Sequence, residues 1–245
     1  MPSHSEVGKL HRANAILSQI RVHEPLLGLF YEDASSEIDR AVQMQRLRRI
    51  AEGAAIIAQH KPKSFLSPST EPRGNKQFAR DILTRQNLRG QWARSIQPSD
   101  LPGLTCAGRL DADSSGLLLW TDDESLVQHI IGPDTPIEKE YLVRVSGHVQ
   151  WSPRERESTL DLLREGIILD GERLRRAEVK FLNEAQLSFT LREGKHRQIR
   201  RMCAEVGLQV VALKRVRIGK LRLASLAPGF WTPLNPAQAA SLFVG

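Results

Sequence analysis

The spacing of short apolar runs between residues 104 and 243 limits the fold more than any other feature of this sequence. The run Leu117–Thr121 (LLLWT) is continuous and apolar, which predicts a buried strand. Further strands are predicted at 54–59, 141–145, 177–181, 187–191 and 209–218. Of these, 177–181 and 187–191 form a hairpin around Asn183 and Glu184.

Helical patterns lie between these strands. They are predicted at 77–83, 123–131, 153–164, 195–206 and 236–243. Pro153 stands at a first helical position, and Gly207 is a typical helix end. Strands and short helices interleave, and many connections suit antiparallel pairing. We therefore predict an α+β fold with a mixed, largely antiparallel sheet and flanking helices.

The chain divides near residue 54. Residues 1–53 form a weakly patterned N-terminal extension, and residues 54–245 form the patterned body. The first twenty residues lack the apolar core of a secretory signal but are poor in acids. The expected location is therefore cytoplasmic, with organelle import left open. The longest uncharged run, 224–244, holds three prolines and few large apolar residues, which argues against a membrane span.

The positive charge is concentrated in one segment. The chain has a net charge of +7, and residues 192–222 alone hold ten basic and two acidic side chains, a net of +8. This excess predicts a polyanionic partner, with folded RNA favoured over a DNA major groove. The alternative is a solvated basic face with no partner.

Spacing suggests how this basic segment presents its charge. On a helix, Arg197, Arg200 and Arg201 would share one face. Lys214 and Arg215 interrupt an apolar strand, which predicts a place at the edge or rim of the sheet. Such a cluster can neutralise several phosphates.

The sequence predicts no metal site. The two cysteines, Cys106 and Cys203, are far apart and form no Cys-x-x-Cys pair. Both are expected to be buried, unreactive thiols.

One carboxylate stands where catalytic groups are often found. Asp111 lies in a turn-forming stretch directly before the buried strand, and such loops are held by a rigid element. In a purely structural interpretation, Asp111 caps the turn and pairs with Arg109. A glycosidase-like pair with Asp113 is disfavoured, because side chains two apart in a turn have poorly controlled spacing. A metal site would need further ligands that the neighbouring sequence does not supply.

Three segments together resemble a known family. Gly108-Arg-Leu-Asp111-x-Asp-Ser-x-Gly116-Leu-Leu is similar to the catalytic motif of RNA pseudouridine synthases of the RsuA/RluB/RluE/RluF type. Glu138-Lys-Glu-Tyr141-Leu-Val-Arg-Val resembles the family's Lys-x-Tyr strand, and Arg192–Cys203 running into Leu213–Gly219 resembles its C-terminal signature. Lys61-Pro62 resembles a weaker opening motif. The resemblance covers about residues 54–234, in the family's order.

The resemblance implies an activity. The family isomerises uridine in RNA to pseudouridine by cutting the base from the ribose at N1, rotating it and rejoining it through C5, without a cofactor or metal. It implies that Asp111 is the catalytic carboxylate and Arg200 its partner. It also implies that Tyr141 stacks on the target base and that Arg109 fills the gap of the flipped uridine or contacts phosphate. Other side chains expected to contact the substrate are Lys61, Lys195, Arg197, Arg201, Lys214 and Arg215.

The sequence departs from the family in two places. Many members carry a small N-terminal RNA-binding domain, whose pattern is missing from residues 1–53. In the opening motif, Lys61-Pro62-Lys63-Ser64 lacks the glycine that usually follows Lys-Pro by one residue.

The expected substrate is ribosomal RNA, with transfer RNA left open, and the expected state is a monomer. The alternatives are a non-catalytic RNA-binding or ribosome-assembly factor on the same fold, and a different RNA-acting enzyme such as a nuclease.

Overall fold

The computed structural model describes residues 54–67, 75–132, 135–147 and 151–242. The body formed by residues 54–245 is one compact unit. The predicted N-terminal extension, 1–53, lies outside the described residues. Within the described residues, no helix has both the length and the apolar character needed to cross a bilayer.

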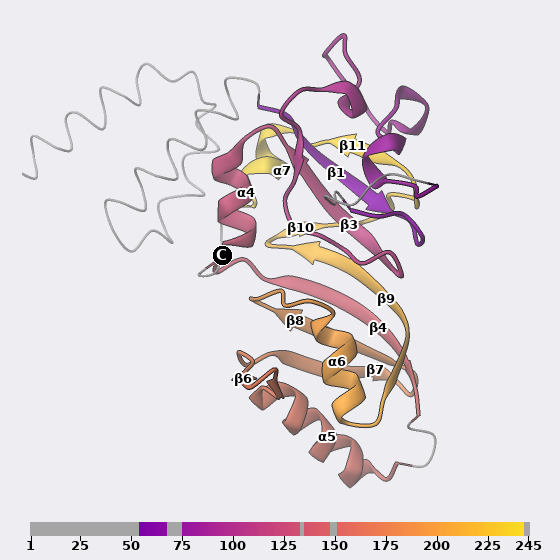
Figure 1. The fold of residues 1–245 in the computed structure, drawn as a ribbon, viewed down its shortest axis with the longest axis vertical. Coiled ribbons are helices and arrows are strands. Elements are labelled where there is room, and N and C mark those ends of the chain that lie inside the picture. The colour runs from indigo at the N-terminus through magenta and orange to yellow at the C-terminus, as the bar shows by residue number, and fades with distance from the viewer. Residues whose placement is uncertain (1–53, 68–74, 133–134, 148–150, 243–245) are drawn as a thin grey trace, which may run out of the picture. The chain divides into compact units, whose positions relative to one another are not determined.

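A single large sheet organises the body (Figure 1). The order of its main strands is β11-β1-β3-β9-β4-β8-β7, with β2 paired to β3 and β10 paired to β9. Neighbours are antiparallel except for β3 and β9, which run parallel. The described strands are β1 (Ile56–Lys61), β2 (Thr105–Cys106), β3 (Ser114–Thr121), β4 (Lys139–Ser146), β7 (Glu178–Asn183), β8 (Gln186–Leu191), β9 (Gln209–Ile218), β10 (Leu221–Arg222) and β11 (Trp231–Pro233). The predicted α+β class and mixed, largely antiparallel sheet are confirmed.

The apolar run in β3 is explained by its place inside the sheet. β3 lies between β1 and β9, and Leu117, Leu118 and Trp120 are completely buried. The indole of Trp120 donates to Gln59 Oε1 on β1 at 2.9 Å. Every residue of β1 is buried as well. A strand enclosed on both faces and both edges needs a continuous apolar run rather than an alternating one.

Helices flank the sheet, and local caps set where they begin. Helix α4 (Glu124–Ile131) starts after Asp123, whose carboxylate accepts from two backbone N–H groups. Helix α5 (Pro153–Glu165) starts with a capping box between Ser152 and Glu155. Helix α5 packs on β7, and helix α6 (Gln198–Glu205) packs on β9. A short α7 (Pro236–Ala240) follows β11, and the small hairpin β5 (Ile168–Leu169) and β6 (Glu172–Arg173) follows α5.

Several predictions differ from the structure. The helix predicted at 195–206 begins only at Gln198, because Arg197 adopts a left-handed backbone conformation with φ of 49°. The predicted helix at 77–83 is a short 3-10 turn, Ala79–Ile82. The strand β9 lies in the interior of the sheet, so the edge position predicted for Lys214 and Arg215 is wrong.

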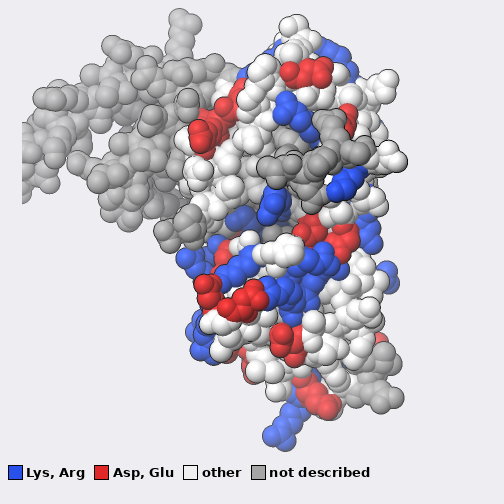
Figure 2. All heavy atoms as spheres, in the orientation of Figure 1, with Lys and Arg blue, Asp and Glu red and all other residues white. Residues whose placement is uncertain are grey.

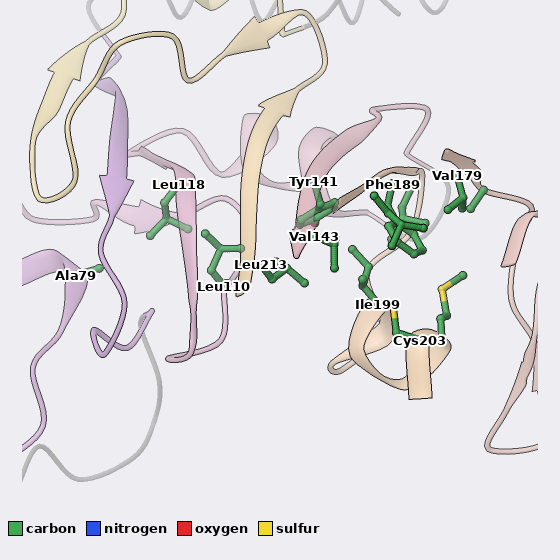
Figure 3. Close-up of a cluster of buried hydrophobic side chains, with 14 of the residues drawn as sticks. Ala79, Leu110, Leu118, Tyr141, Val143, Val179, Phe189, Ile199, Cys203 and Leu213 are labelled. Atoms are coloured by element: carbon green, nitrogen blue, oxygen red, sulfur yellow. The ribbon is translucent and has the colours of Figure 1, made fainter. Parts of the chain in front are cut away.

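The hydrophobic core reaches the loop that carries Asp111. In Figure 3 the side chain of Leu110 points toward Leu213 of β9, and both belong to one buried cluster. Ile199 and Cys203 of α6 join the same cluster with Tyr141 of β4. The loop before β3, the strand β4 and helix α6 are therefore fixed to one another by packed side chains.

Candidate active site

The loop before β3 is held by backbone hydrogen bonds on both sides. The hydroxyl of Ser67 donates to Leu110 O at 2.9 Å and accepts from Leu110 N at 2.9 Å. Ser64 N donates to Ala112 O at 2.7 Å, and Ser114 N closes a turn onto Asp111 O at 3.1 Å. Asp111 is thus presented from a fixed backbone rather than from a free loop.

A cleft of about 1130 Å³ opens at this loop. Its lining includes Asp111 from the loop, Tyr141 from β4 and Arg200 from α6, the three residues predicted to be catalytic. The same cleft is lined by the expected substrate contacts Arg109, Lys195, Arg197 and Arg215. Tyr141 is about nine-tenths buried, so it presents part of its ring to the cleft while the rest packs in the core.

The cation that contacts Asp111 is Arg197. Its Nη1 lies 3.7 Å from Asp111 Oδ2, and its Nη2 lies 3.0 Å from Asp113 Oδ2. Arg200, the partner expected from the resemblance, pairs instead with Asp113 at 3.2 Å and donates to Val210 O. The late start of α6 explains the difference, because the left-handed turn at Arg197 places this residue before the helix.

Asp113 forms ion pairs with both Arg197 and Arg200. Burial alone would raise its pKa, but the hydrogen bond from Arg197 and the charges of Arg200 and Arg197 hold the pKa below its ordinary value. Asp113 therefore remains an anion that pairs with both guanidinium groups and holds that of Arg197 beside Asp111. This is a positioning role that the sequence pattern did not assign to it.

Comparison with known proteins identifies the fold around this cleft. Residues 55–205 match the family model described as RNA pseudouridylate synthase. The chain belongs to this family. It is 37% identical to ribosomal small subunit pseudouridine synthase A of Escherichia coli K12 over 142 residues, which cover 57% of this chain and 59% of that protein. It is 35% identical to ribosomal large subunit pseudouridine synthase B of Salmonella typhimurium over 188 residues, covering 75% and 58% of the two chains.

Two further similarities cover more of the relative's length. Ribosomal small subunit pseudouridine synthase A of Vibrio cholerae is 31% identical over 194 residues, which cover 78% of this chain and 75% of that protein. A solved pseudouridylate synthase structure superimposes with a TM-score of 0.63 at 28% identity, covering 77% and 74% of the two chains. Asp111, Tyr141 and Arg200 all lie inside the matched segment, whereas Lys214 and Arg215 lie beyond it.

Lys61 of this synthase-family chain is no surface contact for RNA, contrary to the prediction. Its side chain is completely buried, and Nζ donates to Pro62 O at 2.9 Å and Phe65 O at 2.6 Å. Burial lowers its pKa to about 8, although the charges of Asp111 and Asp113 oppose this shift. Lys61 is therefore an internal cation that closes the turn beneath the Asp111 loop.

The buried position of Lys61 predicts a pH effect on stability. The unfolded lysine binds a proton up to about pH 10.5, whereas the folded one releases it near pH 8. Between these values the unfolded state holds more protons, so folding stability rises with pH. As the pH rises across this window, the free energy of unfolding of the wild type is expected to increase by roughly 3 kcal/mol relative to that of Lys61→Met. Urea unfolding at several pH values measures the difference, with exposed Lys63→Met as the control. Parallel pH curves for wild type and Lys61→Met would contradict this account.

Arg215 and Lys214 also lie elsewhere than predicted. Arg215 is 2% exposed, and its Nε donates to Leu117 O at 2.7 Å while Nη1 donates to Arg109 O at 3.3 Å. It therefore braces the Asp111 loop against β3 from inside the sheet. Lys214 is half-buried and, by the alternation of a strand, faces away from the side of Arg215. It is not among the residues that line the cleft.

The +8 segment is largely neutralised by acids from other parts of the chain. Arg201 pairs with Asp170 at 2.6 Å, and Lys195 pairs with Glu172. Arg217 pairs with two glutamates of the β4 region, Glu138 and Glu140. Figure 2 accordingly shows Lys and Arg side chains mixed with Asp and Glu across the middle of this face. The segment is not a free basic surface, and Arg201 is directed to Asp170 rather than to the carboxylates of the cleft.

The sequence analysis assigns no role to Lys139, the lysine of the segment that resembles the family's Lys-x-Tyr strand. It lines the cleft and is 6% exposed. The signal was present, because Lys139 and Tyr141 are two apart on a strand and so share a face. Among the described residues, no group of three or more His, Cys, Asp or Glu is placed to hold a metal ion.

Proposed function

We propose that this chain isomerises a uridine to pseudouridine in ribosomal RNA, with Asp111 as the catalytic carboxylate. The observation that carries the proposal is the cleft in which Asp111, held by Arg197, lies with Tyr141 in a family of RNA pseudouridylate synthases. The relatives above are named for ribosomal small and large subunits, which supports ribosomal RNA as the substrate.

The geometry suits the two halves of the reaction. Asp111 is one-third exposed, so its carboxylate can reach the sugar of a nucleotide in the cleft. It either adds to C1′ of the ribose or assists formation of a glycal, and in both routes the C1′–N1 bond breaks. The guanidinium of Arg197 lies beside this carboxylate, with Nη1 at 3.7 Å from Asp111 Oδ2. The Tyr141 ring offers a face on which the freed base stacks and turns before C5 joins C1′.

Substrate entry requires base flipping. Extruding a uridine from its stack costs a few kcal/mol. Arg109 lies in the same loop as Asp111 and lines the cleft, which supports a role in filling the gap or contacting phosphate. Lys195 and Arg197 also line the cleft and retain 34% and 40% side-chain exposure, so they are accessible to backbone phosphates.

The proposal is tested by release of tritium. Isomerisation exchanges the hydrogen on C5 of uridine, so RNA labelled with tritium at this position loses label to water. Purified protein is incubated with small-subunit and large-subunit rRNA transcripts, and with tRNA as a comparison. We expect one tritium released per modified site from an rRNA transcript. Absence of release from every transcript and from assembled ribosomal subunits would contradict the proposal, and salt-sensitive RNA binding would then favour a non-catalytic RNA-binding factor.

A further inference from the structure

Two buried cations line the cleft beside Asp111 and Tyr141, and the chemistry above uses neither of them directly. Lys139 on β4 is 6% exposed, and Arg215 on β9 is 2% exposed. Burying a charge is costly unless hydrogen bonds satisfy it. The hydrogen bonds of these two side chains therefore indicate what the cleft is built to bind.

Arg215 keeps one donor group unused. Nε and Nη1 donate to backbone carbonyls, but Nη2 is buried and has no hydrogen-bond partner among the described residues. A buried donor left unpaired loses its hydrogen bonds to water without gaining others, which is unfavourable. Because Arg215 lines the cleft, an acceptor on a bound substrate can remove this cost.

Lys139 is similarly under-used. An ammonium group has three N–H donors, and within the described residues Nζ makes one long hydrogen bond, 3.4 Å to Ile137 O. Burial and the neighbouring Arg215 guanidinium both lower its pKa, to about 8. Burial and Arg215 both disfavour the charged form of Lys139. A hydrogen-bond acceptor next to Nζ would favour that form.

The donors of Lys139 and Arg215 lie on the same face of the sheet as Tyr141. Tyr141 stands opposite Arg215 in the pairing of β4 with β9. Lys139 precedes Tyr141 by two residues, so both side chains leave the same face of β4. A base stacked on the Tyr141 ring therefore presents an edge to the two cations. In uracil, two edge atoms are carbonyl oxygens, which are hydrogen-bond acceptors.

We propose that Lys139 and Arg215 together bind a carbonyl oxygen of the target uracil and stabilise the ring as it leaves the ribose. This inference rests on the proposed function. When the C1′–N1 bond breaks, its electron pair passes to N1 and delocalises onto O2 and O4. The C5–C1′ bond then forms as the bond from Asp111 to C1′ breaks or, in the glycal route, as C2′ regains the proton it lost. C5 loses a proton to solvent and N1 gains one from solvent, so the atoms and charges balance. Fixed cations beside the oxygen that gains charge favour the transition state over the ground state.

A phosphate is a poorer occupant for this site. A backbone phosphate is joined to the chain on both sides and needs an open approach, whereas Lys139 and Arg215 are almost fully enclosed. More exposed cations, Lys195 and Arg197, stand in the same cleft. Their burial therefore favours Lys139 and Arg215 as contacts of the base. The more exposed Lys195 and Arg197 are favoured as contacts of the RNA backbone.

The test compares Lys139→Met with wild type on modified substrates. Short RNAs are built around the uridine that the wild type modifies, with uridine, 2-thiouridine or 4-thiouridine at that position. On uridine, we expect Lys139→Met to lower the single-turnover rate by about 100-fold or more, with little change in RNA affinity. A thiocarbonyl is a weak acceptor. With sulfur at the contacted position, the gap between wild type and variant is expected to shrink below about 5-fold, as coupled perturbations of one contact do.

Two further variants serve as controls for the effect of Lys139→Met. Lys139→Arg keeps the charge and is expected to restore most of the rate. Lys180→Met removes an exposed lysine from β7 and should behave as wild type. Thermal unfolding confirms that each variant is folded.

The inference is overturned if Lys139→Met is as active as wild type, or if its defect is the same on all three RNAs. It is also overturned if the gap shrinks only when a phosphorothioate replaces the phosphate 5′ of the target, because the contact is then to the backbone. In each case an active wild type leaves the proposed function standing. A wild type that modifies no RNA overturns the proposed function and this inference with it.

Discussion

Asp111→Asn is expected to abolish isomerisation while leaving RNA binding intact. The amide keeps the size of the side chain and its contact distance to Arg197, 3.7 Å in the wild type, but carries no charge. It cannot serve as a nucleophile at C1′ or stabilise positive charge on the sugar. Tritium release is expected to fall by at least about 1000-fold, since the proposal has the group act in the bond-breaking step. Affinity for the same RNA should change little, because the proposal assigns phosphate contacts to other side chains.

A matched variant separates chemistry from charge. Asp161→Asn removes one carboxylate from the exposed face of α5, where Asp161 pairs with Arg164 at 3.1 Å. It should release tritium at the wild-type rate. Turnover by Asp111→Asn near the wild-type rate would contradict a catalytic role for Asp111. A loss of RNA binding equal to the loss of rate would instead assign Asp111 to substrate binding.

Sequence patterns located the centre of the cleft well because its information is local. Asp111 was found from a turn directly before an apolar run, and the structure presents it from a braced turn at the start of β3. Tyr141 was placed on a strand, and it lies on β4. Those features depend on a few consecutive residues.

The partners of these residues were predicted less well, because they depend on packing between distant segments. Arg200 was expected beside Asp111, but a left-handed residue before α6 brings Arg197 there. Helical spacing cannot show this, since it assumes that the helix has already begun. Lys61 was expected to contact the substrate, and only the fold shows that it pairs with Gly116 of β3 and that its side chain is completely buried.

Charge counting indicates a polyanionic partner, but it cannot show which basic side chains are paired within the protein. The excess in residues 192–222 suggested a free basic surface. In the fold, Arg217 pairs with Glu138, just before β4, and with Glu140 of β4. Arg201 pairs with Asp170 of the β5–β6 turn. Net charge along a segment reports composition, and the sheet order decides which acids come near it.

Gly116→Ala is expected to have the largest effect on stability. Gly116 lies in β3 opposite Arg215, where the parallel strands β3 and β9 approach closely. A Cβ on Gly116 would stand 2.2 Å from Arg215 O and 2.6 Å from Arg215 N, and its backbone φ of +115° disfavours any L side chain. Backbone atoms cannot swing aside as a side-chain tip does. We expect the variant to lose at least about 4 kcal/mol of unfolding free energy, or to fail to fold.

Gly171→Ala isolates the steric part of this effect. Gly171 also has a positive φ, +79°, but a Cβ there meets nothing within 4 Å. It should cost only about 1–2 kcal/mol, the strain of a left-handed backbone. Urea unfolding followed by fluorescence reports both variants, because Trp120 and Trp231 are completely buried. Equal losses in the two variants would show that β9 can move away from β3. A much larger loss at Gly116 would show that the close approach of β3 and β9 is fixed. This approach also sets the position of Arg215, whose Nη1 donates to Arg109 O in the loop that presents Asp111.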